Sequence, residues 1–261
     1  MSTTLKIMRY ELRDVIRSRS IIAYAVFFFL VTETLLRFAG GAKAALSLMN
    51  VVLLLIPLVS IVFSTIYLYH AREFTEMLLA QPVRRAQLFV GQFLGLALPL
   101  CAAFVVGLSG PFAMHWSDGV PLDTLVTIGV CGALLTITFT AFGALLVARI
   151  DDRVKGIGAA IGLWLGLTII YDGLVMMGLV VFADYPVEPA ALGAMVVNPI
   201  DLARVLILLR LDISALMGYT GAVFHQFFSD AFGTTVAALA LAAWATLPLV
   251  LGARHFRKKD F

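Results

Sequence analysis

Two acidic residues stand inside long apolar stretches, where a carboxylate can bind an ion, relay a proton or hold a polar substrate. Glu33 lies in the first of these stretches and Asp172 in the fifth. A carboxyl group within a membrane-spanning helix is costly and is therefore a candidate functional group. Arg37 follows Glu33 by one helical turn, so we expect a structural ion pair between them. For Asp172 the sequence leaves open substrate binding, gating of an outer cavity and a structural hydrogen bond.

The remaining reactive side chains lack the arrangements that covalent or metal chemistry needs. Residues 107–110 match the Gly-x-Ser-Gly of an intramembrane serine protease, but none of the four histidines lies in another apolar stretch to serve as the base. Cys101 and Cys131 are far apart and predict no disulfide. Methionines and histidines are scattered, so we expect no metal site. No Walker A sequence occurs, and the chain is not expected to be an enzyme.

The composition is that of a membrane protein. Of the 261 residues, 61% are hydrophobic and 13% are charged, whereas a soluble domain carries about 25% charged residues. The basic N-terminus and the long apolar run after it are not typical of a signal peptide. We predict an all-α polytopic protein with one transmembrane domain, 1–261. Helices of about 20 apolar residues cross the hydrocarbon core, and the predicted spans are 20–38, 45–69, 88–114, 123–148, 156–183 and 231–253.

The distribution of positive charge predicts the orientation. Most of the 19 Lys and Arg residues lie on one side of the membrane when both termini are cytoplasmic, as the positive-inside rule requires. A seven-span alternative has 190–211 crossing the membrane. It places Asp201, Arg204 and Arg210 in lipid, at about 2.5–3.5 kcal/mol for each central charge. We therefore prefer six spans, with both termini on the cytoplasmic side.

The external segment, 184–230, is expected to contain a helix that lies against the membrane. Asn198 can cap this helix, and Pro199 suits its first position. Asp201 falls in the first turn, where the positive end of the helix dipole favours an acidic side chain.

Residues 3–19 predict an amphipathic helix before the first span. One side is lined by apolar residues and another by cations at helical spacing. The apolar residues are Leu5, Met8, Leu12, Val15 and Ile16, and the cations are Lys6, Arg9, Arg13 and Arg17. Such a helix is typical of the anionic cytoplasmic leaflet, so membrane lipids are an expected partner.

The segment 70–87 is too polar to cross the membrane and too regularly patterned for a plain loop. We expect a short cytoplasmic helix over 70–82, ended by Pro82, with an apolar ridge, an acidic flank and two arginines just beyond it. A helix of this kind suits docking into a partner's groove, although contact with lipid headgroups alone is an alternative. The residues predicted for this site are Glu73, Phe74, Glu76, Met77, Leu78, Arg84 and Arg85.

Glycines recur along the fifth span. Gly158, Gly162, Gly166 and Gly173 fall on one face at about 100° per residue. Small residues at this spacing let two helices approach closely in lipid. We expect an interface between two copies of the chain, with packing inside one chain as the alternative.

Taken together, these features resemble the ABC-2 family of permeases. Residues 73–91 match the pattern E-x-x-x-x-LL-x-x-P-x-x-R-x-x-x-x-x-G of the family's coupling-helix region. The resemblance implies a homodimer and a separate cytoplasmic ABC ATPase that binds ATP and Mg²⁺. It implies no cofactor on this chain and no nucleic-acid partner.

Two further features are similar to one branch of that family. The sequence V-N-P-I-D at 197–201 and the aspartate in the fifth span resemble the permeases used in maturing the copper sites of nitrous oxide reductase. This similarity implies a location in a bacterial inner membrane, a periplasmic partner protein and a copper chaperone. The alternatives are an ABC-2 exporter of a lipid, drug or polysaccharide, and an ion-coupled secondary transporter.

Overall fold

The structure, a computed structural model, describes residues 3–39, 41–80, 83–114, 121–182, 188–211 and 231–258. Within these ranges the regular elements are all helical, which confirms the all-α prediction. They are α1 (Thr3–Arg17), α2 (Arg19–Ala39), α3 (Gly41–His70), α4 (Arg72–Leu79), α5 (Arg85–Met114), α6 (Leu122–Arg149), α7 (Arg153–Leu165), η1 (Gly166–Ile170), α8 (Tyr171–Val181), α9 (Glu188–Val197), α10 (Pro199–Arg210) and α12 (Ala231–Lys258).

Six of the described helices are long and apolar enough to cross a membrane, as predicted. They are Arg19–Ala39, Lys43–His70, Arg85–Met114, Leu122–Arg149, Arg153–Val181 and Leu239–Lys258. The first connection is shorter than the expected 39–44, because α3 begins at Gly41. The φ of +43° at this glycine is a left-handed conformation that lets the chain turn sharply.

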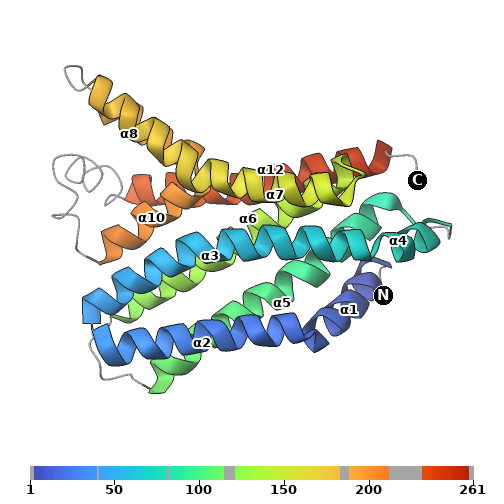
Figure 1. Ribbon diagram of the computed structural model, residues 1–261, viewed down its shortest axis with the longest axis horizontal. Coiled ribbons are helices and arrows are strands. Elements are labelled where there is room, and N and C mark those ends of the chain that lie inside the picture. The colour runs from blue at the N-terminus through green and yellow to red at the C-terminus, as the bar shows by residue number, and fades with distance from the viewer. Residues whose placement is uncertain are drawn as a thin grey trace.

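Helix α6 lies at the centre of the bundle and contacts α3, α5, α10 and α12 (Figure 1). Helices α1 and α2 pack on α5, on the side away from α12. Fully buried side chains fill the core, among them Phe28, Ile56, Phe104, Leu135 and Phe139. Lipid tails are as apolar as these side chains, so the hydrophobic effect gives helices little reason to associate. Close packing of this kind therefore holds the helices together.

Helices α1 and α4 and the C-terminal part of α12 lie at one end of the bundle, which we call the α4 end (Figure 1). Helix α10, the end of α2 and the start of α3 lie toward the opposite end. The fifth span runs between the two ends as α7, η1 and α8.

Two glycines of α5 allow α1 to lie directly on it. A Cβ atom at Gly91 would lie 3.0 Å from the Ile7 Cβ atom. One at Gly95 would meet the Glu11 side chain and lie 3.2 Å from the Met8 carbonyl oxygen. The four-residue spacing puts both glycines on one face of α5, so the two helix backbones approach closely.

The packing of α1 corrects the predicted apolar side of this helix. The buried face consists of Ile7, Glu11 and Val15, whereas Leu5 and Ile16 are exposed. Helix α1 therefore binds protein along one face, and its four cations remain exposed on the others. The sequence pattern missed this face because a buried carboxyl group stands at its centre.

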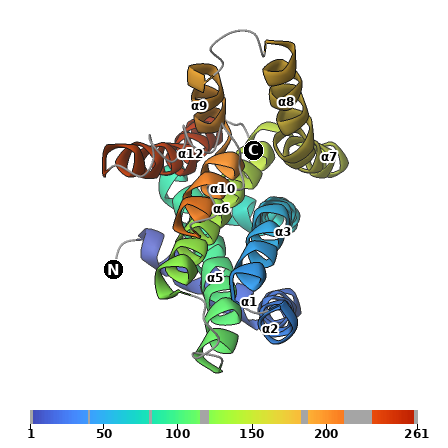
Figure 2. The same ribbon diagram turned by 90° about the vertical axis from the view of Figure 1, so that its left-hand side faces the viewer.

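Helix α10 is enclosed in the bundle, which corrects the expectation of an external helix lying against the membrane. Ile200, Leu202, Ala203 and Ile207 are fully or almost fully buried, and α10 contacts α3, α6 and α12 (Figure 2). Its 12 residues are too few to span the bilayer, but a helix that is apolar on several sides must still be covered. Of the predicted external segment, 184–187 and 212–230 lie outside the described residues.

The close approach at α5 gives a direct prediction. Gly95→Ala should force α1 away from α5 and destabilise the protein by about 1–3 kcal/mol, the usual effect of overpacking. The measurement is the apparent melting temperature of the purified protein in detergent. Gly178→Ala on α8 is the matched control, because no described residue outside this helix lies within 4 Å of a Cβ atom there. Equal melting temperatures for the two variants would contradict the observed packing of α1.

Candidate functional site

Of the side chains on the α4 face that was predicted for docking, some pack against the bundle and others are exposed. Leu78 is half-buried and packs on a cluster that includes Leu88, Phe89 and Phe256. Met77 is 65% exposed. The helical pattern correctly placed Leu78 and Met77 near each other, but it could not tell which side chain the bundle covers.

Phe74 also has a partner inside the chain. Its ring stacks on Tyr10 of α1, with 5.4 Å between the ring centroids and 21° between the planes. Phe74 and Leu78 are therefore not free anchors for a partner, which corrects the predicted ridge. The surface that α4 presents outward consists of Met77 with Glu73 and Glu76, whose side chains are exposed.

Arg72, which the sequence analysis did not single out, connects α4 to the α6–α7 connection. Its guanidinium donates to Glu76 Oε1 at 3.1 Å, to Asp151 Oδ1 at 3.1 Å and to the Asp151 carbonyl oxygen at 3.1 Å. The Tyr69 hydroxyl donates to the Ile150 carbonyl oxygen at 2.8 Å. Two donors of one guanidinium on one residue give a directional link that a single charge contact lacks. The signal in the sequence was an arginine and an aspartate in two segments predicted on the same side of the membrane.

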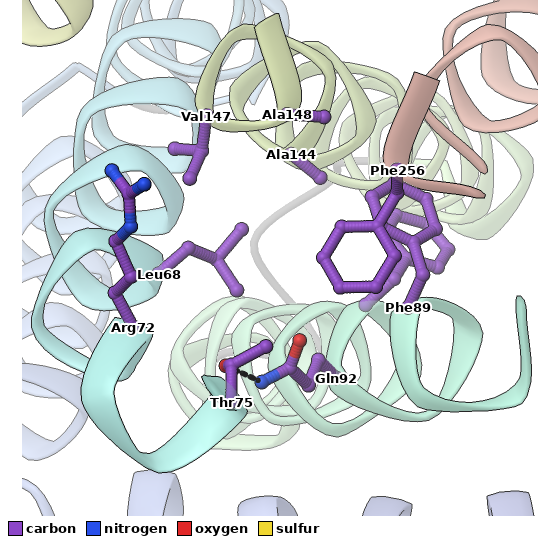
Figure 3. A pocket seen from close by; sticks show the side chains of 10 residues that line it. Leu68, Arg72, Thr75, Phe89, Gln92, Ala144, Val147, Ala148 and Phe256 are labelled. Carbon is purple, nitrogen blue, oxygen red and sulfur yellow. Dashed lines mark hydrogen bonds between the residues drawn. The ribbon is translucent and has the colours of Figure 1, made fainter. Parts of the chain in front are cut away.

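A small cavity of about 40 Å³ lies beneath α4 (Figure 3). Thr75 and Gln92 face it and are joined by a hydrogen bond of 2.8 Å from Gln92 Nε2 to Thr75 Oγ1. Phe89 and Phe256 form another side of the cavity. The inner face of α4 is thus fixed by polar contacts as well as by apolar ones.

The two predicted arginines lie where α5 begins. Arg84 is exposed, and Arg85 is half-buried and donates to the Arg257 carbonyl oxygen at 3.3 Å. Arg85 therefore ties the start of α5 to the end of α12, as an anchor of the third span should.

The glycine face of the fifth span is unoccupied by the rest of the described chain. At Gly158, Gly162, Gly166 and Gly173, nothing lies within 4 Å of a Cβ atom. None of the most apolar window of this span is buried, and α7 and α8 stand at the edge of the bundle (Figure 2). Among the described residues this face therefore has no packing partner inside the chain.

The fifth span is not a continuous α-helix. Residues Gly166–Ile170 form a π-helical turn, which no sequence signal indicated. A π-turn changes the angle per residue, so Gly173 is rotated away from the line of the three earlier glycines. Such turns are frequent at functional sites.

Asp172 belongs to an ion-paired cluster that joins α8 to α10. Arg204 donates to Asp172 Oδ2 at 3.0 Å and to Asp201 Oδ1 at 2.8 Å. The side chain of Asp201 is 10% exposed, against 30% for Asp172. Burial raises the pKa of the Asp201 carboxyl, and the charge of Arg204 offsets only part of this effect. Arg204 was not among the predicted site residues, although its position three residues after Asp201 places both on one helical face.

Asn198 connects the same cluster to the π-turn. Its Oδ1 accepts from the Ile200 N–H at 3.0 Å and so caps α10, with Pro199 at the first helical position. Its Nδ2 donates to Asp201 Oδ2 at 2.9 Å and to the Leu167 carbonyl oxygen at 2.8 Å. One side chain thus caps α10, holds Asp201 and binds the backbone of η1.

Glu33 lies apart from this cluster. It accepts from Arg37 Nε at 2.6 Å, and its helix α2 packs on α3 and α5 rather than on α8. Among the described residues, no three His, Cys, Asp or Glu side chains are grouped as a metal site would need. Cys101 and Cys131 are free thiols.

These features define a multi-pass helical membrane protein with a short exposed helix at one end and an ion-paired cluster near the other. The family described as "ABC-2 family transporter protein" matches residues 5–261, so the chain belongs to the ABC-2 family. It is the membrane-spanning permease subunit of an ABC transporter, a non-catalytic kind of subunit, and permeases of this family work with a cytoplasmic ATPase. Family membership excludes the ion-coupled secondary transporter.

Two relatives are similar to the chain over almost its whole length. A "Probable ABC transporter permease protein NosY" from Pseudomonas aeruginosa is 27% identical over 279 aligned residues, which cover 99% of each chain. A protein of the same name from Stutzerimonas stutzeri is 25% identical, also with 99% of each chain covered.

The cluster at Arg204 predicts an order of stabilities. Arg204→Gln leaves two carboxylates without their cation and should destabilise the protein by about 2 kcal/mol, between the values for exposed and buried pairs. Asp172→Asn should have a smaller effect, because Arg204 keeps Asp201. Arg37→Gln is the control, since its side chain is 62% exposed. Melting temperatures in detergent that fall equally for Arg204→Gln and Arg37→Gln would contradict the role of the cluster.

Proposed function

We propose that the chain is a NosY-like permease, which converts ATP hydrolysis by a separate ATPase into motion that serves copper-site maturation of nitrous oxide reductase. The full-length similarity to proteins named NosY supports this. So does the use of the V-N-P-I-D sequence, in which Asn198 and Asp201 bind η1 and Arg204.

The α4 end faces the cytoplasm in this proposal, together with both termini. A NosF-like ATPase docks there on Met77, Glu73 and Glu76, the outward side chains of α4, and ATP and Mg²⁺ bind to that partner. The exposed cations of α1 lie in the same layer, where anionic lipid headgroups bind them.

The observation that carries the proposal is a pair of arginine links to the fifth span, one just before it begins and one in its outer half. Arg72 joins α4 to Asp151, directly before α7. Arg204 joins α10 to Asp172 in the first turn of α8. A displacement of α4 by the ATPase would thus reach α7, pass the π-turn and move α10.

The far end of the bundle faces the periplasm. There the α9–α10 segment transmits the motion to a NosD-like partner, with a NosL-like copper chaperone as a further partner. Two copies of the chain assemble through the open glycine face of the fifth span, and this interface places the two α8 helices beside the molecular axis.

One observation favours the ABC-2 exporter as a second candidate. A cavity of about 290 Å³ lies between α3, η1 and α10. Its lining combines the apolar Leu53 and Ile200 with the polar Asn50, Thr168 and Arg204. Purification of the intact complex with mass spectrometry separates the two functions: an external protein partner supports maturation, whereas ATP-driven movement of a lipid or drug by permease and ATPase alone supports export.

The exposed face of α4 predicts which substitutions weaken docking. Met77→Ala should weaken ATPase binding about tenfold, because buried apolar anchors dominate such interfaces and tenfold corresponds to about 1.4 kcal/mol. Glu73→Arg should weaken binding by repulsion if basic residues line the groove. The measurement is the affinity of the purified ATPase for the permease in detergent or nanodiscs.

Leu122→Ala serves as the control, because it removes an exposed apolar side chain at the far end of the bundle. Leu78→Ala should lower the melting temperature of the permease itself. Wild-type affinity in both Met77→Ala and Glu73→Arg would contradict the docking role of α4.

The open glycine face predicts a separation of assembly from folding. Gly162→Leu should abolish the homodimer and leave the melting temperature of the monomer unchanged. Outside its own helix, no atom of the described chain lies within 4 Å of a Cβ atom at this position. Native mass spectrometry in detergent measures the oligomeric state. Gly193→Leu on α9, where no atom of the described chain meets a Cβ atom either, should keep the dimer. A dimer that survives Gly162→Leu would show that this face contacts lipid.

A further inference from the structure

Three buried polar side chains meet where α1, α4 and α5 come together. Glu11 on α1 is 2% exposed, Thr75 on α4 is 5% exposed and Gln92 on α5 is 4% exposed. Gln92 Nε2 donates to Thr75 Oγ1, and the Thr75 hydroxyl donates to the Ala71 carbonyl oxygen at 2.8 Å. An amide nitrogen carries two hydrogens, so Gln92 can donate one hydrogen bond to Thr75 and another to the neighbouring Glu11. Buried polar groups need such partners.

A tyrosine of α3 completes this arrangement from the other side. The Tyr67 hydroxyl oxygen lies 2.6 Å from Glu11 Oε2 and 3.0 Å from Asp14 Oδ2. A phenol has one proton, so both contacts are full hydrogen bonds only if one carboxyl group carries a proton. Glu11 is the buried one of the two, and its Oε1 has no hydrogen-bond partner among the described residues. A neutral Glu11 that donates to Tyr67, which in turn donates to Asp14, satisfies both contacts.

The electrostatic environment agrees with this arrangement. Burial raises the pKa of the Glu11 carboxyl, and the nearby Asp14 adds to the effect, while Tyr67 and Gln92 offset part of it. From helix α5, Gly95 lies against the Glu11 side chain, and the neutral Gln92 is beside its carboxyl group. Arg19, which begins the neighbouring α2, is exposed. The cations of α1 are exposed on its other faces: Lys6, Arg9, Arg13 and Arg17.

We propose that Glu11 is a positioning residue, which in its neutral form locks α1 to α3, α4 and α5 so that α1 and α4 move as one body. The stacked rings of Tyr10 and Phe74 join the same two helices directly. The consequence for coupling rests on the proposed function, in which α4 docks the ATPase. Helix α1, on the membrane surface, and helix α4, beneath the ATPase, then move together as one rigid unit.

The sign of the pH dependence follows from the raised pKa. The lock is complete at low pH, where Glu11 is neutral, and is lost as the pH rises through the raised pKa of Glu11. Above it, a buried carboxylate with an unpartnered oxygen destabilises the contact of α1 with α5. Glu11→Gln stays neutral at every pH and should remove this dependence.

The test measures the geometry of α1 and α4 directly. Spin labels at Arg13→Cys and Met77→Cys, both exposed positions, are introduced with Cys101→Ala and Cys131→Ala. The permease is studied alone in vesicles of zwitterionic and anionic phospholipid, over a range of pH. We expect a narrow distance distribution that broadens as the pH rises. It should stay narrow in Glu11→Gln, be broad at every pH in Glu11→Ala, and match the parent in the control Asp123→Asn.

A second readout uses the complete complex with its ATPase, without spin labels. ATPase stimulation by the permease should fall with rising pH in the parent, stay level in Glu11→Gln and be lost in Glu11→Ala. A narrow distribution in Glu11→Ala, or a pH dependence in Glu11→Gln equal to that of the parent, would overturn the proposal. The distances are measured without the ATPase. They therefore test whether Glu11 holds α1 and α4 together even if α4 is not the docking helix.

Discussion

Charged groups in an apolar bundle must be paired, and the described arrangement depends on where these pairs fall. An unpaired charge in hydrocarbon is costly, and this applies to the half-buried Arg204 with Asp172. The pair of Arg72 with Asp151 is more exposed and lies at the α4 end, where it joins two segments by directional hydrogen bonds. Arg72 and Arg204 each bind a carboxylate of another segment, and those carboxylates, Asp151 and Asp172, bracket the inner part of the fifth span. Within the part of the chain that the structure describes, α7 packs mainly on α3, and the glycine face of this span has no neighbour. The pairs therefore connect the two ends of the molecule through its most exposed helix.

The π-turn gives this exposed helix a defined point of adjustment. Its Leu167 carbonyl oxygen accepts from Asn198, which also caps α10 and holds Asp201. A change in η1 is thereby felt at the start of α10 without passing through the core. The core itself, built on Phe28, Phe104 and other fully buried side chains, packs too densely to deform gradually. Motion in the proposed mechanism is accordingly carried by the fifth span against a fixed set of central helices.

Hydropathy and charge were sufficient to predict the six spans, because each is long, apolar and flanked by polar residues. They failed at α10, because hydropathy cannot distinguish an apolar helix that faces lipid from one enclosed by protein. They also failed at α1, because the side of this helix that packs on protein is not uniformly apolar. The buried Glu11 interrupts the apolar face of α1. The glycines against which this face packs, Gly91 and Gly95, belong to α5, which is distant in the sequence. The short helix α4 was predicted from its pattern, but the contacts of Phe74 with Tyr10 and of Leu78 with the bundle appear only in the tertiary structure.

The transfer of motion from α4 to α8 is the central claim, and a distance between α8 and the fixed core tests it most directly. Spin labels at Val180 of α8 and Leu122 of α6 are both at exposed positions of the far end. In the complex with its ATPase, ATP binding should change this distance, and Arg72→Ala should abolish the change while the ATPase stays bound. A distance that changes equally in Arg72→Ala, or that does not respond to ATP at all, would contradict the account.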